Sequence, residues 1–419
     1  MNKKVIAAVG VVIVLAALIA AAVVTSSKGT GHESATQPLE ISLSNAPKKI
    51  KVGVIVSLTD DPRQGNGYRN AVQGVVVAKE RLRAANTEVT LLSANDKGSQ
   101  EGAKEAVDIL KEQGAAAIIV GTSGAHAKYI SRQAEKDGIA AIFPYGGSEP
   151  AAATSFSMVP DLAEEAKGVR KIIELAGLRQ IVVVDAGEGD LGLKFRKVQA
   201  AGEADKVQVV HQLAQEAKAG HSIGAAVVVG DPLSQAELIA AFQGEKLNVP
   251  IVIPAVTANE AFESKLAEKG SLYANLYGVG IENVDMATLQ GGAKGESAAT
   301  FFTALNQYAS DPQIKDSLGK EEFSKAAGRA DGISHDGLIA VVAAAGKAGS
   351  VDPEDVAKSL NDLELSTEDG LVSGDMSVSN GQIQIADEPK PLVSTVQSPG
   401  VRENAPQRLY WFDLTEAQK

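Results

Sequence analysis

The sequence contains no cysteine, which excludes disulfide bonds, thiolate metal sites, cysteine nucleophiles and lipid attachment at an N-terminal cysteine. Aromatic residues make up only 4% of the chain, so few rings are available to stack on bases or sugars. The histidines are scattered, and none of them form the i, i+4 pair of a helical zinc site. They are His32, His126, His211, His221 and His335.

The chain also lacks an excess of positive charge. Its formal net charge is −12 and its pI is about 5.1, with no basic block. Nucleic-acid binding depends on neutralising phosphates with lysine and arginine, so a nucleic-acid partner is not expected. The residue inventory likewise gives no reason to expect a metal site or a cofactor.

The N-terminus carries the longest apolar run. Asn2-Lys3-Lys4 precedes an uncharged stretch from Val5 to Val24, whose length lies between that of a signal peptide and that of a membrane span. The lysines ahead of the run predict that the rest of the chain is exported. Residues 1–28 are therefore expected to be a signal peptide or a membrane anchor, and the polar residues 29–48 a linker. The body would lie outside the cytoplasm, anchored at the outer face of the membrane, secreted or periplasmic.

From residue 49 onward, apolar β-branched runs alternate with segments of helical periodicity, which predicts βαβ units and parallel sheets. Two such series, divided near residues 157–160, predict two α/β lobes. Expected strands are 50–57, 87–93, 115–121, 139–144, 180–185, 206–210, 225–230 and 249–255. Expected helices are 67–84, 99–113, 125–137, 162–176, 191–202 and 233–244. Parallel sheets bind ligands at the carboxyl ends of their strands, so the loops that follow the strands are the candidate sites.

One such loop, from Gly187 to Gly192, fits the dinucleotide-binding pattern G-x-G-x-x-G between an expected strand and an expected helix. The dinucleotide-binding fold also requires an acidic residue at the end of the next strand, where this chain has His211-Gln212. The sequence therefore favours a glycine-rich turn over a nucleotide site.

A second loop, Gly121-Thr122-Ser123-Gly124-Ala125, misses the nucleophile elbow G-x-S-x-G by its last residue. A hydrolase would also need an acid and a histidine downstream, and Asp231 with His335 satisfies that order. The alternative is that Ser123 caps the following helix and, with the free N–H groups there, holds a carboxylate.

The third loop, Tyr145-Gly146-Gly147-Ser148-Glu149-Pro150, exposes backbone N–H groups at two glycines and adds the Ser148 hydroxyl. It follows the Ser123 loop by one βα unit, so the two loops are expected to be neighbours. Two adjacent loops suited to a small anion favour a binding site.

Taken together, these stretches resemble the type I periplasmic solute-binding proteins of the leucine/isoleucine/valine-binding kind, which serve ABC importers. The resemblance covers most of residues 49–395. It rests on KIKVGVIVSL, ANDKGSQEGAKEAVDILKEQGAAAIIVGTSGA, GIAAIFPYGGSEPAAATSFSMVPD and ADGISHDGLIAVVAAAGKAGSVDPEDVAKSLNDL, in that order. The implied fold class is α/β, with two Rossmann-like lobes with parallel sheets that close on a ligand by hinge motion. The expected first lobe comprises residues 49–158 and 284–385, and the second 159–283 and 386–419.

The resemblance also implies a ligand site between the lobes. Ser123 matches the serine that binds an amino-acid carboxylate, and Gly147 and Ser148, next to Tyr145, fall where the family binds the same group. Tyr68 is the candidate aromatic of the first loop. Where the family often has a ligand-contacting tyrosine, this chain has Leu191. Candidate partners of the α-ammonium are Asp231, Glu188 and Asp190.

The expected function is that of a non-catalytic, extracytoplasmic protein that binds an amino acid or a related small polar solute. Its expected partners are that small molecule, an ABC permease, and the membrane through the N-terminal helix. The alternative is a membrane-anchored ligand-sensing receptor module that acts through a partner protein.

Overall fold

The computed structural model describes residues 41–148, 152–187, 190–200, 202–256, 260–269, 271–272, 276–385, 389–403 and 406–417. The expected N-terminal helix lies outside these residues, as does most of the linker. Within the described ranges, no helix combines the length and hydrophobicity that crossing a membrane requires.

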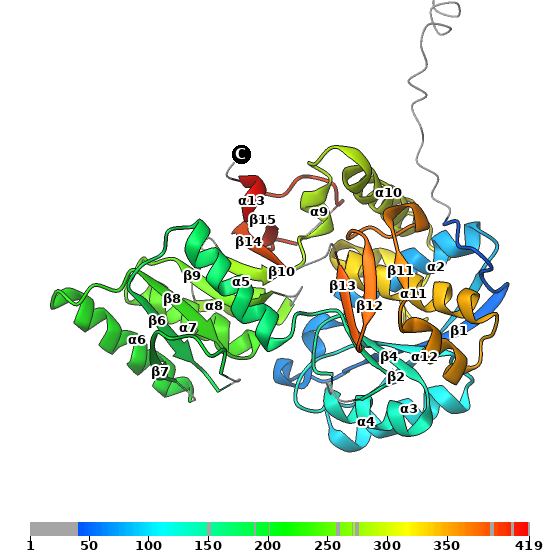
Figure 1. Ribbon diagram of the computed structural model, residues 1–419, viewed down its shortest axis with the longest axis horizontal. Helices are drawn as coiled ribbons and strands as arrows, with labels where there is room; N and C mark the ends of the chain where they lie inside the picture. Colours follow the sequence, from blue (N-terminus) through cyan, green and yellow to red (C-terminus); the bar gives the residue numbers. More distant parts are fainter. Residues whose placement is uncertain are drawn as a thin grey trace, which may run out of the picture. The chain divides into compact units, whose positions relative to one another are not determined.

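The first sheet has the strand order β11-β12-β13-β5-β4-β3-β1-β2 (Figure 1). Its strands are β1 (Lys49–Val56), β2 (Glu88–Asn95), β3 (Ala117–Gly121), β4 (Ala140–Phe143), β5 (Ser155–Ser157), β11 (Glu364–Leu365), β12 (Met376–Ser379) and β13 (Gln382–Ile385). The strands from β1 to β5 are parallel to their neighbours, and β13 joins β5 in parallel through Gln382 and Ser157. β11, β12 and β13 are antiparallel to one another.

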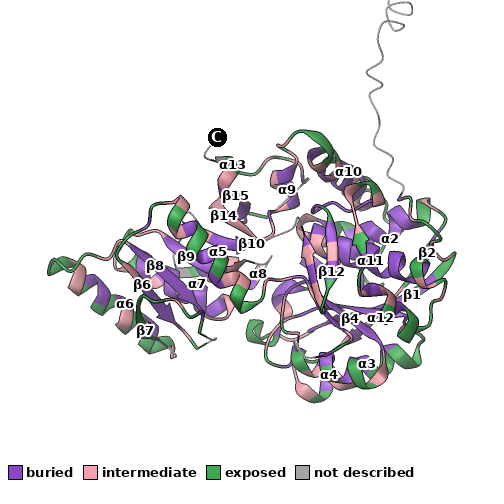
Figure 2. Ribbon diagram, in the orientation of Figure 1, coloured by how far each residue is buried: buried purple, intermediate pink, exposed green. Residues whose placement is uncertain are grey.

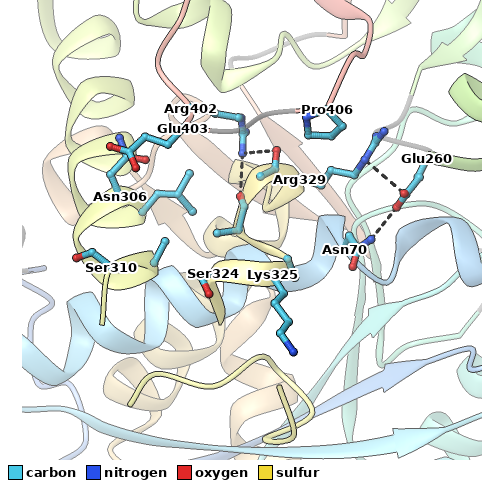
Figure 3. Close-up of a pocket in the computed structure, with 15 residues that line it drawn as sticks. Asn70, Glu260, Asn306, Ser310, Ser324, Lys325, Arg329, Arg402, Glu403 and Pro406 are labelled. Atoms are coloured by element: carbon cyan, nitrogen blue, oxygen red, sulfur yellow. Dashed lines mark hydrogen bonds and ion pairs between the residues drawn. The ribbon is translucent and has the colours of Figure 1, made fainter. Parts of the chain in front are cut away.

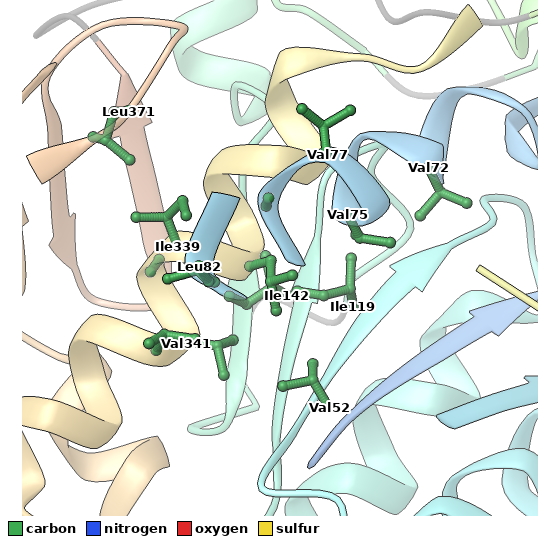
Figure 4. Close-up of a cluster of buried hydrophobic side chains, with 14 of the residues drawn as sticks. Val52, Val72, Val75, Val77, Leu82, Ile119, Ile142, Ile339, Val341 and Leu371 are labelled. Atoms are coloured by element: carbon green, nitrogen blue, oxygen red, sulfur yellow. The ribbon is translucent and has the colours of Figure 1, made fainter. Parts of the chain in front are cut away.

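Helices cover this first sheet. They are α2 (Gly74–Ala84), α3 (Gln100–Glu112), α4 (Ala127–Asp137), α10 (Gly292–Ala309), α11 (Gly332–Ala348) and α12 (Pro353–Leu360). Short 3-10 turns are η1 (Pro62–Gln64), η2 (Asn66–Tyr68), η3 (Ala71–Gln73), η4 (Phe323–Lys325), η5 (Ala327–Arg329) and η6 (Thr367–Asp369). One core cluster packs Val52 and Ile119 of the sheet against Val75 of α2 and Ile339 of α11 (Figure 4).

The second sheet has the order β15-β14-β10-β9-β8-β6-β7. Its strands are β6 (Ile181–Asp185), β7 (Arg196–Gln199), β8 (Ala225–Val229), β9 (Ile251–Val256), β10 (Leu276–Gly280), β14 (Lys390–Thr395) and β15 (Tyr410–Asp413). Its helices are α5 (Leu162–Leu175), α6 (Glu203–Lys218), α7 (Pro232–Gly244), α8 (Glu260–Lys269), α9 (Val284–Ala287) and α13 (Leu414–Ala417). Figure 2 shows the strands of both sheets as largely buried, with exposed residues gathered on the helices and loops.

The chain passes between the two sheets three times: after β5, after β10 and after β13. The first sheet thus takes strands from residues 49–157 and 364–385, and the second from 181–280 and 390–413. The lobe limits given above remain a prediction at the level of single residues.

Two secondary-structure predictions are wrong. The expected helix 191–202 is a loop followed by β7, and the expected strand 206–210 lies inside α6. In α6 the buried residues are Lys206, Val210, Leu213 and Ala214, a helical spacing that outweighs the β-branched run Val209-Val210. In the loop, Gly192 has φ +59° and donates its N–H to the Asp190 carboxylate, a local turn that competes with a helix.

Candidate functional site

A cleft of about 590 Å³ lies where carboxyl ends of strands from both sheets meet. It is lined by three groups of residues. The first-sheet loops contribute Tyr68, Ser123, Tyr145, Gly146, Gly147 and Ser148. The strand β5, the crossover after it, the start of α5 and the β12–β13 hairpin contribute Ser155, Ser157, Val159, Pro160, Asp161, Leu162, Glu164, Glu165, Ser379, Asn380, Gly381, Gln382 and Gln384. The second-sheet loops contribute Val229, Gly230, Pro232, Gln235, Pro254 and Ala255.

Ser123 follows β3 and lies in this cleft, half-buried. Its hydroxyl has no hydrogen-bond partner among the described residues. The helix that follows begins at Ala127 with His126 as its N-cap, so the expectation that Ser123 caps this helix is wrong. The hydroxyl therefore faces the cleft region without a structural role within the described chain.

A buried polar network lies directly behind Ser123 and ties the ends of three strands together. Ser57, after β1, donates to Asp96 after β2 at 2.7 Å, and its hydroxyl lies 2.7 Å from that of Thr122 after β3. His126 Nε2 lies 2.9 Å from the other Asp96 oxygen. All four residues are buried. Such a satisfied network fixes the strand ends and so presets the position of Ser123.

This network contains serine, histidine and aspartate, but it does not have the geometry of a hydrolase triad. A triad places the carboxylate on one ring nitrogen and the nucleophile on the other. Here the same nitrogen, Nε2 of His126, lies 2.9 Å from Asp96 and 3.4 Å from Ser57. The arrangement holds the strand ends together and does not activate a hydroxyl.

The alternative triad partners of Ser123 are also engaged elsewhere. His335 is buried within α11, with Nδ1 2.8 Å from Asp336 and Nε2 3.0 Å from Arg81, and burial lowers its pKa. Asp231 caps α7 by accepting hydrogen bonds from the backbone N–H groups of Leu233 and Ser234. Neither is a catalytic partner of Ser123.

The loop after β4 forms the neighbouring part of the same wall, as predicted for two adjacent loops. Gly146 and Gly147 have φ of +85° and +86°, and a Cβ at Gly147 would lie 2.8 Å from that of Ala127. Only glycine fits this close approach to α4 without displacing it. Gly147 and the half-buried Ser148 both line the cleft.

Two tyrosines form the aromatic part of the cleft wall. The rings of Tyr68 and Tyr145 stack with centroids 4.4 Å apart, and both residues are almost fully buried. The Tyr145 hydroxyl donates to Asp331 at 2.9 Å. Asp331 caps α11 through Ser334 N, and burial raises the pKa of its carboxyl to about 6. The aromatic pair is thus fixed to the start of α11.

The second-lobe residues that were predicted to contact the ligand do not gather in the cleft as the first-lobe residues do. Asp231 lies between two cleft-lining residues, Gly230 and Pro232, but its carboxylate caps α7 and also accepts from Ser234 Oγ. Leu191 is buried in the second-lobe core, and Asp190 accepts from Gly192 N; neither is among the described residues that line the cleft. Glu188 lies outside the described residues.

Acidic residues at the start of α5 were not predicted as part of the site. Asp161 and Glu164 form a capping box, and Glu164 also accepts from Gln384 of β13. Glu165 follows on the same turn, half-buried. The sequence signal was D-x-x-E ahead of an apolar run, which identifies a helix start and says nothing about a ligand.

One ion pair joins the two lobes near the cleft. Arg63, in the loop after β1, lies 3.2 Å from Glu237 of α7, which also pairs with the buried Lys206 at 2.7 Å. Hydrogen bonds from these cations lower the pKa of Glu237, although burial opposes them. Arg63 is therefore paired within the chain.

A second cavity of about 440 Å³ is lined by residues of α10, η4 and η5 and by Arg402, Glu403 and Pro406 (Figure 3). Its cations are already paired: Arg402 with Asp285, Arg329 with Glu263 and Lys325 with Glu321. It lies away from the strand ends that form the first cleft. The first cleft is therefore the candidate ligand site.

The fold also decides whether the G-x-G-x-x-G pattern at residues 187–192 forms a nucleotide site. Gly187 donates its N–H to Asp185, and the following described residues lead into β7 and open no helix. A dinucleotide site needs a helix N-terminus at this point. Across the described residues, no group of three or more histidine, aspartate or glutamate side chains is placed to hold a metal ion.

No protein-family model matches the sequence. No curated protein matches it either.

Solved structures do match the fold. A leucine-binding protein from Thermotoga maritima aligns with a TM-score of 0.58 at 16% identity, over 87% of this chain and 97% of that one. A branched-chain amino acid transporter substrate-binding protein from Streptococcus pneumoniae, in complex with isoleucine, aligns with a TM-score of 0.60 at 14% identity, over 87% and 99%. A type 1 periplasmic binding protein from Bordetella pertussis aligns with a TM-score of 0.57 at 15% identity, over 87% and 100%.

The chain therefore has the type I periplasmic-binding-protein fold, and the predicted fold class is confirmed. At these identities the likeness defines the fold, so the ligand has to be argued from the cleft itself.

Proposed function

We propose that the chain is a non-catalytic solute-binding protein that binds an amino acid or a related small polar solute in the cleft between its lobes. The observation that carries this proposal is the cleft of about 590 Å³, a volume typical of small-molecule sites. Its first-lobe wall sets the Ser123 hydroxyl beside the Gly146–Ser148 loop, which suits a carboxylate. Hydrogen bonds to a charged group are strong enough to anchor a small ligand in a closed cleft.

In this proposal the first lobe holds the carboxylate at Ser123, Gly147 and Ser148, and Tyr68 and Tyr145 bound the pocket. The second lobe closes over the ligand with Val229, Gly230, Pro232 and Gln235. Catalysis is not part of the proposed function. His126 and His335, the histidines considered as members of a hydrolase triad, make structural hydrogen bonds to Asp96 and Asp336.

The partner that we propose is a membrane permease of the ABC type, which receives the solute from the cleft. Support comes from the fold, since the matching chain from Streptococcus pneumoniae is described as a transporter substrate-binding protein. Export of the body, with residues 1–28 as signal peptide or anchor, remains a prediction from the sequence.

The test is thermal unfolding of the purified full-length chain, alone and with a panel of amino acids, amides, sugars and small anions. A solute at about 100 times its dissociation constant adds roughly 2.7 kcal/mol to the free energy of unfolding, which raises the melting temperature by a few degrees. A shift confined to one chemical class supports the proposal and identifies that class. If no solute on the panel gives a shift, the proposal fails.

A further inference from the structure

A segment of the second lobe reaches into the first lobe. It is the connection between β14 and β15, both strands of the second sheet, and its described residues, 396–403 and 406–409, are called the strap below. Val401 of the strap packs against the core cluster of the first sheet. Asn306 of α10 donates its side-chain N–H to the Val401 carbonyl at 3.3 Å. The strap therefore links the lobes in addition to the three crossovers.

Arg402 fixes the strap to the first lobe. Its guanidinium makes a bidentate pair with Asp285, just after the second crossover, at 2.6 and 2.8 Å, and both side chains are 1% exposed. Its third nitrogen donates to the carbonyl of Ala330 at 2.8 Å and, at 3.4 Å, to that of Ala327 in η5 (Figure 3). Its Cζ lies 4.9 Å from the centre of the Phe302 ring. A buried guanidinium with several directed hydrogen bonds holds its position far better than a surface ion pair does.

The other end of the strap is held by the same group of charges. Arg408 lies 3.3 Å from Asp285, and the backbone N–H of Leu409 donates to Glu263 of α8 at 3.0 Å. Glu263 in turn pairs with Arg329 of η5 at 2.6 Å, which joins a second-lobe helix to the first lobe. Each of these charges faces an opposite charge, so separating the lobes at this point leaves poorly solvated charges without partners.

The contacts of the strap extend to the wall of the cleft. Arg402 is hydrogen-bonded to the Ala330 carbonyl, and the next residue, Asp331, accepts the hydrogen bond from the Tyr145 hydroxyl. Tyr145 lines the cleft, whereas none of the described strap residues does. The strap therefore positions the cleft wall without contacting a solute in the cleft.

Building on the solute-binding function proposed above, we infer that the strap is a hinge restraint, which favours the arrangement of the lobes in which both of them line the cleft. Arg402 is its positioning residue. Contacts that are present in one arrangement and broken in another shift the equilibrium toward the first. Moving the second sheet away from η5 stretches the strap and separates Glu263 from Arg329. The strap changes the population of the binding-competent arrangement and not the contacts in the cleft, so it raises the affinity for every solute by the same factor.

The first experiment needs no solute. Spin labels at Glu101→Cys on α3 and Gln208→Cys on α6, two exposed positions, report the distribution of distances between the lobes by pulsed electron paramagnetic resonance. In this background, Asp285→Asn together with Arg402→Met removes the main fixed point of the strap. Replacing both charges leaves no unpaired buried carboxylate, so the fold is kept. This double variant should give a broader distribution with a longer mean distance than the wild-type strap.

Two further variants separate the restraint from a general loss of stability. Asp336→Ala removes buried hydrogen bonds within the first lobe alone, so it should lower the melting temperature and leave the distance distribution unchanged. Arg402→Lys keeps the charge but cannot bridge Asp285 and Ala330 at once, so it should lengthen the mean distance less than the double variant does. Arg402→Lys also decides the matter if the double variant does not fold.

The second experiment measures affinity by isothermal titration with leucine, glutamine, arginine and glutamate. Every amino acid that binds the wild-type chain should bind the double variant about tenfold more weakly, by the same factor for each of them. Factors that differ from one amino acid to another would contradict the inference, because they would mean that the strap alters the contacts in the cleft.

The outcomes separate this inference from the proposed function. A folded double variant, or a folded Arg402→Lys variant, with the distance distribution of the wild type would overturn the role of the strap and leave the solute-binding function standing. An equal lengthening in Asp336→Ala would overturn it as well. If no solute binds, the proposed function fails, and the distances still decide whether the strap restrains the lobes.

Discussion

The two lobes share a fold plan but differ at the edge where a ligand would bind. At the carboxyl edge of the first sheet, Ser57, Asp96, Thr122 and His126 form a buried network, and Tyr145 is tied to Asp331. The loops that follow the second-sheet strands present Val229, Gly230, Pro232, Pro254 and Ala255, with Gln235 as their polar side chain in the lining, and the start of α5 adds Asp161, Glu164 and Glu165. The strand-end loops of the first wall are fixed and polar, and those of the second are mostly apolar or backbone.

This difference indicates that the two lobes have different roles in ligand binding. A wall whose strand ends are held by satisfied buried hydrogen bonds is preorganised, so a ligand that binds there loses little free energy in ordering it. A wall of small and apolar residues adapts to the ligand that is already bound and excludes water from it. We therefore expect the first lobe to determine affinity for the polar groups, and the second lobe to close over them.

The largest expected effect comes from breaking the buried polar core of the first lobe. Asp336 accepts hydrogen bonds from the N–H groups of Val372 and Ser373 and lies 2.8 Å from His335 Nδ1. Asp336→Ala leaves these groups without their partner and removes a negative charge that favours the buried Arg81 guanidinium, which should cost about 3–5 kcal/mol in the free energy of unfolding. Urea denaturation followed by circular dichroism measures it.

The matched control lies in the second lobe, where Glu245 pairs with the exposed His211. Glu245→Ala should change the free energy of unfolding by about 0.5 kcal/mol or less. A loss for Asp336→Ala as small as that of this control would contradict the contrast between the lobes.

A pH dependence follows from Asp331. Burial raises the pKa of its carboxyl from 3.8 to about 6 in the folded chain. The folded chain therefore keeps this proton when the unfolded chain has lost it, so the contribution of Asp331 to stability is fully present below pH 3.8. It is lost as the pH rises through about 6, by up to about 3 kcal/mol.

Asp331→Asn should remove that loss, so the difference in stability between variant and wild type should rise in favour of the variant between pH 4 and pH 7. Thermal unfolding across that range measures it. A difference that is constant with pH would show that Asp331 has an ordinary pKa in the folded chain.

The fold and the site were predictable from the sequence to different extents. Strands such as β3 and helices such as α3 were predicted well because their apolar residues follow one period and turn residues flank them. α6 was missed because Val207, Val209 and Val210 suggested a strand, although only the helical spacing to Leu213 buries a continuous face. The missing helix before β7 has a local cause in the turn at Gly192.

For the site, the loops that follow β3 and β4 were predicted as neighbours, because the carboxyl ends of parallel strands meet at one edge. Glu165 was not predicted as part of the cleft lining, since its position depends on how the crossover after β5 is placed against the first lobe. No local pattern encodes that placement. The role of Asp231 as a cap is encoded locally in D-P-L-S, and the resemblance to a ligand-binding family obscured it.

A smaller effect is expected for ligand affinity when single side chains are removed from the two walls of the cleft. Ser123→Ala removes a hydroxyl from the fixed wall and should weaken an amino-acid ligand by about 1.5–3 kcal/mol, the value of a hydrogen bond to a charged group. It should affect the corresponding amide far less. Gln235→Ala, in the wall of the second lobe, should cost less than Ser123→Ala.

Isothermal titration of both variants gives the comparison, with Ser222→Ala as a control on an exposed second-lobe turn. Equal losses for the amino acid and its amide in Ser123→Ala would show that this serine does not bind a carboxylate.

The smallest expected effect concerns the ion pair between Arg63 and Glu237, one of those that join the lobes. The side chain of Arg63 is 50% exposed, so its pair with Glu237 is screened by solvent and should contribute about 0–1 kcal/mol. Arg63→Ala should leave the melting temperature almost unchanged and weaken ligand binding slightly, more at low salt than at high salt. A large loss of stability would indicate that this pair, rather than the first-lobe network, holds the cleft together.

The most direct test of the account is the distance between the lobes with and without a ligand. Because the natural chain has no cysteine, Glu101→Cys on α3 and Gln208→Cys on α6 provide two specific labelling positions, both exposed. A solute that raises the melting temperature should bring the two labels closer together, and the change should disappear in Ser123→Ala at the same solute concentration. Binding with no change in this distance would contradict a fixed first lobe over which the second lobe closes.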